Sequence, residues 1–189
     1  MTNLADLLAR VEKLEARAEI GELVSAYAIA CDDHDMPRLM SLFTDDAVLE
    51  TPSGLMHAEG KPAIDALFVQ TFKIRGPAFH WTHDHFVRFD LGPDEASGLV
   101  LAHAETSPNQ EVSLAAMRYE DVYRKVGRRW LFARRRINFL YYVPAKDFPQ
   151  SLTSATRITV SGRSLPADYP EQTAPWQAFD AAHNVTERK

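Results

Sequence analysis

The apolar residues of the chain change from a helical spacing to a strand spacing near residue 47, and this change constrains the fold most. Before it, apolar residues recur at three- and four-residue steps, which predicts helices over residues 3–30, with a break near Gly21, and over 37–43. One more helix is predicted over 61–72. The predicted strands cover residues 47–51, 80–90, 98–106, 112–125 and 130–143. Helices followed by consecutive antiparallel strands are typical of an α+β domain whose helices cover one face of a curved sheet.

The last quarter of the chain differs in composition from the rest. It is polar and contains several prolines, so we divide the chain into a folded domain, residues 1–145, and a C-terminal tail, residues 146–189. A short strand is predicted at 156–160, and Trp176 and Phe179 suggest that part of the tail is anchored. We expect the tail to form a lid over a binding site or an arm over a neighbouring subunit, or to be partly disordered.

Composition excludes several classes of function. The 189 residues carry 21 basic and 26 acidic side chains, a net charge of −5, which disfavours nucleic acid or an anionic membrane as a partner. No apolar run approaches the roughly 20 residues of a membrane span, and the N-terminus lacks the apolar core of a signal peptide. The single cysteine, Cys31, excludes an intramolecular disulfide. We therefore expect a cytoplasmic protein.

Three short segments resemble those of a known family. They are Ala16-Arg17-Ala18-Glu19-Ile20, the pair Tyr27 and Asp32, and Phe43-Thr44-Asp45-Asp46-Ala47-Val48. Together they resemble the SnoaL-like branch of the NTF2-like superfamily, and the resemblance extends from about Leu4 to Val143. It implies a cone formed by a bent antiparallel sheet, with helices packed into its mouth, a binding cavity inside, and assembly as a homodimer or homotrimer.

Members of that branch differ in activity, so the resemblance implies a set of functions. The set includes cofactor-independent dehydratases such as scytalone dehydratase and bile-acid 7α-dehydratase, a dehydrochlorinase, polyketide cyclases and isomerases. Non-catalytic relatives include the small subunits of ring-hydroxylating dioxygenases. Because fold alone does not give function, the side chains of the cavity must decide.

Tyr27, Asp32 and His80 are the candidate catalytic residues. The dehydratase-type members place a tyrosine, an aspartate and a histidine at matching positions. A neutral imidazole accepts a proton well near neutral pH, and a carboxylate on its other nitrogen fixes the tautomer. A tyrosine hydroxyl can donate a hydrogen bond to a leaving or developing oxygen anion. Each residue also has a purely structural interpretation, as a loop carboxylate, a core tyrosine or a strand histidine.

Four further residues are candidates for binding the substrate. His103 shares a strand face with leucines and is expected to point into an apolar region. There it would either hold an active-site water or substrate oxygen, as the resemblance implies, or be a buried histidine with a backbone partner. Arg134 and Arg136 share one strand face and Arg135 takes the other; of the three we expect Arg136 to face the cavity. The aromatic side chains Phe79 and Trp81 suit a cavity for an aromatic or alicyclic molecule.

The segment from 80 to 85 contains three histidines and requires a metal hypothesis. His83 and His85 form a His-x-His pair, which together with a distant ligand could hold a metal ion. His80 has the opposite strand parity unless a bulge intervenes. We expect no metal and no cofactor.

The sequence therefore favours a cofactor-free lyase acting on a small, largely apolar substrate. Its reaction is dehydration or a related elimination, including release of formaldehyde. An isomerase or cyclase, a dioxygenase small-subunit-like or ligand-binding module, and a metal enzyme built on His83 and His85 remain alternatives.

Overall fold

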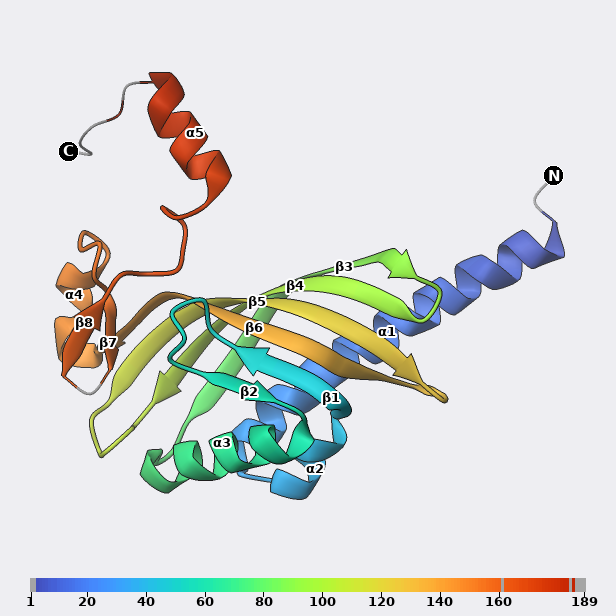
Figure 1. The fold of residues 1–189 in the computed structure, drawn as a ribbon, viewed down its shortest axis with the longest axis horizontal. Coiled ribbons are helices and arrows are strands. Elements are labelled where there is room, and N and C mark those ends of the chain that lie inside the picture. Colours follow the sequence, from blue (N-terminus) through green and yellow to red (C-terminus); the bar gives the residue numbers. More distant parts are fainter. Residues whose placement is uncertain (1–2, 161, 184, 186–189) are drawn as a thin grey trace.

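A curled, mostly antiparallel sheet forms the body of the protein (Figure 1). The computed structural model describes residues 3–160, 162–183 and 185. The sheet order is β2-β1-β6-β5-β4-β3, with β7 and β8 continuing from β6. The strands are β1 (Phe43–Glu50), β2 (His57–Glu59), β3 (Phe79–Gly92), β4 (Glu95–Thr106), β5 (Ser113–Val126), β6 (Arg129–Pro144), β7 (Ile158–Val160) and β8 (Arg163–Leu165). The predicted α+β class is confirmed.

Three helices precede β3. They are α1 (Leu4–Asp32), α2 (Met36–Ser41) and α3 (Lys61–Ile74). α1 packs against β3 and β6, and α3 packs against β1 and β2, so both lie on the inner side of the curl (Figure 1). β1 pairs in parallel with β6, whereas β3 to β6 are joined as successive antiparallel hairpins. This arrangement places the end of α1 beside the start of β3.

α1 is one continuous helix, so the predicted break at Gly21 is wrong. A glycine inside a helix costs about 1 kcal/mol relative to alanine, which the burial of the second half of the helix outweighs. The first half extends beyond the sheet (Figure 1), with apolar side chains that are 41–70% exposed. These side chains are Leu4, Leu7, Leu8, Val11 and Leu14.

An aromatic cluster fills the space between α1, α3 and the sheet. Tyr27 is at its centre, with edge-on contacts to four rings whose centroids lie 5.6–6.3 Å away. Those rings belong to Phe43, Phe68, Tyr119 and Phe132. Such edge-to-face pairs add to the energy of burial and fix the orientation of α1 inside the curl.

A bulge interrupts the pairing of β3 with β4. Thr82 pairs with Ala102 and His85 with Val100, so two residues of β3 face one of β4. The extra residue shifts the alternation of side chains by one position, so that even-numbered residues before the bulge and odd-numbered residues after it lie on the same side of the sheet. His80 and His85 therefore both point inward.

The tail folds back on the sheet. It contains η1 (Ala145–Asp147), α4 (Phe148–Ser151), β7, β8 and α5 (Ala174–His183). The predicted strand is present but shorter, and it pairs with β6 at Tyr142 and Ile158. The Arg157 guanidinium fixes the tail by donating to carbonyls of Leu140, Ser154 and Tyr169 and to Glu171.

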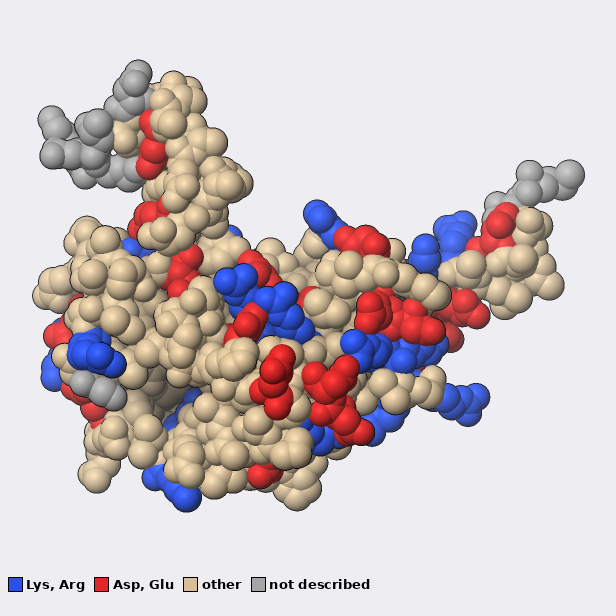
Figure 2. All heavy atoms as spheres, viewed as in Figure 1, with Lys and Arg blue, Asp and Glu red and all other residues tan. Residues whose placement is uncertain are grey.

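α5 stands away from the sheet (Figure 1) and buries no side chain. Phe179 is 56% exposed, so the anchor expected at this residue is wrong. Ile158 and Arg157, both buried, anchor the tail instead. None of the described helices is long and apolar enough to cross a bilayer. On the face seen in Figure 2, acidic and basic side chains are interspersed.

Candidate active site

A histidine and an aspartate meet where α1 ends and β3 begins. His80 Nδ1 lies 2.5 Å from Asp32 Oδ1, and the backbone N–H of His80 donates to Asp32 Oδ2 at 2.9 Å. The two side chains are 10% and 23% exposed, so water reaches them only in part. Because a carboxylate only accepts, it keeps the proton of the neutral ring on Nδ1 and leaves the lone pair on Nε2.

Asp32 occupies a position that local preferences disfavour. It ends α1, where the helix dipole opposes a negative charge. The two hydrogen bonds from His80 compensate for that position. Residues that break a local rule but gain a specific partner concentrate at functional sites.

A small inner chamber adjoins the His80 ring. Its volume is about 50 Å³, and no described residue makes a hydrogen bond to His80 Nε2. The lining side chains are mostly apolar or aromatic. They include Tyr27, Cys31, Met56, Phe68, Arg75, His80, Met117, Tyr119, Ile137, Phe139 and Tyr142. The ring of a candidate base thus lines a small, mostly apolar chamber.

Two other titratable groups in this chamber stay protonated near neutral pH. Burial raises the pKa of the Tyr27 hydroxyl well above its ordinary value. Burial also raises the pKa of the Cys31 thiol to about 12. Tyr27 is therefore a hydrogen-bond donor rather than a base, and Cys31 is not a nucleophilic thiolate.

A larger outer chamber leads to the inner one. Its volume is about 450 Å³, and the two share Met56, Arg75, Phe139 and Tyr142 as lining residues. Strand β7 of the tail forms one wall. Figure 2 shows the surface hollowed between the tail and α3. The two chambers therefore adjoin at these four residues.

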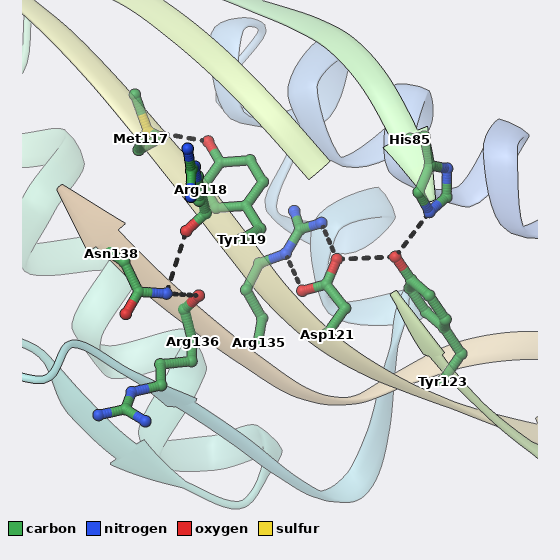
Figure 3. Close-up of polar contacts among 9 residues, drawn as sticks. All are labelled: His85, Met117, Arg118, Tyr119, Asp121, Tyr123, Arg135, Arg136 and Asn138. Carbon is green, nitrogen blue, oxygen red and sulfur yellow. Dashed lines mark hydrogen bonds and ion pairs between the residues drawn. The ribbon is translucent and has the colours of Figure 1, made fainter. Parts of the chain in front are cut away.

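A buried ion pair, Arg135 with Asp121, lies beside the Tyr27 ring, and Figure 3 shows the two charged side chains facing each other. Arg135 donates to the two oxygens of Asp121 at 2.9 and 2.7 Å, and both side chains are fully buried. Asp121 also accepts from the Tyr123 hydroxyl at 2.8 Å, and His85 Nε2 lies 3.1 Å from that hydroxyl. Although burial acts to lower the pKa of Arg135, Asp121 raises it above its ordinary value.

The Arg135 guanidinium also packs among aromatic rings. Its central carbon lies 4.2 Å from the centroid of the Tyr27 ring, with Tyr119 and Phe132 at 4.3 and 4.1 Å. These distances are those of cation–π contacts. The buried guanidinium of Arg135 therefore packs against one face of the Tyr27 ring.

The expectation that Arg136 faces the cavity is wrong. Arg136 lies on the outer face of the sheet, 36% exposed and 4.0 Å from Glu120. The alternation along β6 is as expected, with Arg134 and Arg136 on one side and Arg135 on the other. Arg135 lies on the inner side, where it forms an ion pair with Asp121 on the neighbouring strand.

Three other expected binding residues also lie outside. Phe79 and Trp81 are 54% and 57% exposed, because they alternate with the inward His80. Trp81 donates to Glu105 across the strands at 2.7 Å. His103 pairs in register with Trp81 and contacts His83 on the same outer face. Its leucine neighbours also occupy that face, which explains the misassignment.

The bulge separates the two histidines of the metal hypothesis. His83 faces outward, 2.7 Å from His103, whereas His85 faces inward beside Tyr123. Within residues 3–160, 162–183 and 185, no group of three or more histidine, cysteine or acidic side chains is arranged to hold a metal ion. The hypothesis of a metal site on this pair is therefore not supported by the geometry.

Arg75 lines both chambers but does not stand out in the sequence. It directly follows α3, where a basic residue is ordinary for a helix C-terminus. Asp121 did carry a usable signal, because an acidic residue at inward parity in a strand opposite an arginine indicates a buried pair. Met56 gave no signal beyond its hydrophobicity.

The comparisons with known proteins agree with the fold. A family model described as a SnoaL-like domain matches residues 12–136. No curated protein sequence matches the chain significantly.

Solved structures share the fold at low sequence identity. A type 2 hexachlorocyclohexane dehydrochlorinase (LinA) superposes with a TM-score of 0.67 at 19% identity, covering 82% of this chain and 99% of its own. A protein assigned as a scytalone dehydratase from Novosphingobium aromaticivorans gives 0.65 at 18%, covering 80% and 96%. A protein assigned as an aromatic ring hydroxylase from the same organism gives 0.65 at 25%, covering 71% and 96%.

Proposed function

The chain belongs to the SnoaL-like domain family, and from this premise we propose that it is a lyase that eliminates a leaving group from a small aromatic or alicyclic molecule. It does so with its own side chains and without a cofactor. The His80–Asp32 pair beside the inner chamber is the observation that supports the proposal best. The fold similarity to a dehydrochlorinase and to a protein assigned as a scytalone dehydratase is consistent with it.

His80 acts as the general base. Its Nε2 takes a proton from the carbon next to the one that bears the leaving group, and the C–H electrons form the new double bond. Asp32 keeps the ring in the correct tautomer and stabilises the imidazolium that forms. A general base contributes about 10²–10⁴-fold in rate.

Tyr27 assists departure of the leaving group. As the C–O bond breaks, its hydroxyl donates a hydrogen bond to the developing oxygen anion, and the imidazolium then returns its proton so that water leaves. Burial raises the pKa of Tyr27, so a hydrogen bond fits better than full proton transfer from this residue. Elimination of formaldehyde or of a halide requires the same base.

Two alternatives share parts of this site. An isomerase would use the same base but return the proton to another carbon, so deuterium from solvent would enter the product without loss of a group. A cyclase would use the same base, but the deprotonated carbon would attack a carbonyl carbon of the same molecule and the proton would go to the alkoxide oxygen that forms. A ligand-binding module would use the chambers but not the free Nε2. The inward base supports chemistry over binding alone.

Turnover of hydroxylated and halogenated ring compounds, followed by chromatography and mass spectrometry, tests the proposal. We expect His80→Ala to abolish elimination and Asp32→Asn to reduce kcat by about 10⁴-fold, because the amide favours the wrong tautomer. His57→Ala, at an exposed histidine on β2, is the matched control and should retain full activity. Elimination that survives both His80→Ala and Asp32→Asn would refute the mechanism, and binding without turnover would favour the ligand-binding module.

A further inference from the structure

Arg75 stands at the junction of the two chambers. It lines both the inner chamber beside His80 and the larger outer one. Its backbone N–H donates to the Thr71 carbonyl at 3.1 Å, and the residue forms a β-bridge with Pro108. The guanidinium carbon lies 5.6 Å from the centroid of the Phe72 ring. Two contacts therefore hold the Arg75 backbone, and the Phe72 ring contacts its guanidinium.

The charge of Arg75 has no carboxylate partner among the described residues. It is half-buried, and the ion pairs of the described residues join other groups. One carboxylate, Glu111, occurs among the described residues of the outer chamber, and it pairs with Lys146 at 2.7 Å. Among the described residues that line the chambers, Arg75 is therefore a cation without a direct ion-pair partner.

The volumes restrict what can fill the chambers. About 50 Å³ beside His80 holds only one or two non-hydrogen groups, whereas about 450 Å³ outside it suits a one- or two-ring molecule. Most of the outer wall is apolar, with side chains from α3, β6 and the tail. Phe139, Ile158 and Val160 are examples. The shape favours an apolar ring body outside with a small reacting end inside.

We propose that the ligand is a ring-containing carboxylic acid whose carboxylate pairs with Arg75 at the junction of the two chambers. This inference rests on the proposed function and names the substrate class of the same site. The ring body packs under β7, and the carboxylate accepts charge-assisted hydrogen bonds from the guanidinium. That contact fixes how far the molecule enters, and so which carbon lies against His80 Nε2.

Calorimetric titration of the full chain with matched acids and amides tests the proposal. The probes are benzoate, 2-naphthoate and biphenyl-4-carboxylate, each beside its neutral amide. We expect at least one acid to bind about 10- to 100-fold more tightly than its amide. Arg75→Gln should remove that preference, and Arg75→Lys should retain part of it because a point charge remains.

Lys73→Gln is the matched control, because Lys73 is an exposed cation two residues away on α3. It should leave the preference for acids unchanged, and thermal unfolding should show that every variant is folded. Acids and amides that bind equally, a preference that survives Arg75→Gln, or no binding of any probe would each overturn the proposal.

The same titration in His80→Ala separates this proposal from the proposed function. A retained preference for acids with no turnover supports both. Lost preference in Arg75→Gln supports the carboxylate site even where elimination fails. Elimination without preference for acids supports the lyase and overturns the carboxylate site.

Discussion

Replacing Asp121 with asparagine should destabilise the protein more than any surface charge change. The Asp121 and Arg135 side chains are fully buried and joined by two hydrogen bonds. Asparagine keeps the shape but offers one acceptor, so one of the two bonds becomes a donor–donor contact. Arg135 would then remain buried with its charge uncompensated.

The expected loss follows from that burial. Removing one partner of a buried ion pair costs about 3–5 kcal/mol, against a total stability of about 5–15 kcal/mol for a domain. For a chain of this length, the loss corresponds to a fall in Tm of about 6–20 °C. Glu111→Gln removes an exposed partner of Lys146 and is the control, for which we expect no resolvable shift.

Urea denaturation followed by circular dichroism measures the free energy of unfolding of each variant. The double variant Asp121→Asn/Arg135→Met should recover much of the loss, because it removes the uncompensated charge as well as its partner. Two results would show that the two charges do not compensate each other. One is a loss of unfolding free energy below about 1 kcal/mol in Asp121→Asn; the other is a loss in the double variant equal to the sum of the losses in the two single variants.

Two further predictions concern Cys31 and the tail. Burial raises the pKa of the Cys31 thiol to about 12, so between roughly pH 9 and 12 the unfolded chain loses this proton while the folded chain keeps it. Stability should therefore fall as pH rises through this window, by up to about 1.4 kcal/mol per pH unit, and urea titrations at several pH values should show a shallower fall in Cys31→Ala. Arg157→Ala removes the side chain that holds the tail through four hydrogen bonds. It should release the wall formed by β7, speed proteolysis within the tail and weaken binding of 2-naphthoate; proteolysis and binding equal to wild type would contradict this role.

Periodicity predicted the fold because each long strand and helix has one apolar side. It could not predict that α1 continues past Gly21, since the packing of Tyr27 and its neighbours outweighs the local preference. The meeting of Asp32 with His80 was expected from the family resemblance, and the structure brings the two together.

Assigning the remaining site residues requires knowing which face of the sheet lines the interior. Alternation showed that Arg135 and Arg136 lie on opposite sides, but only the pairing with Asp121 decides which of them is buried. The outward Trp81 and His103 were misassigned for the same reason. Arg75 was not predicted because the outer chamber that it lines forms only when the tail folds back over the sheet.

The bulge in β3 shows that one extra residue in a strand can decide which side chains point into the interior, without any substitution. His83 and Asp84 together face Leu101, so losing either residue would leave His80 and His85 on their present side. Pairing every residue in a regular strand would instead turn His80 outward and Trp81 inward. A chain one residue shorter at the bulge would therefore keep both histidines inward, whereas regular pairing of the full length would not. A related chain that is one residue shorter at the bulge would keep its histidine inward. Aligning it with this chain without a gap at the bulge would pair inward residues with outward ones.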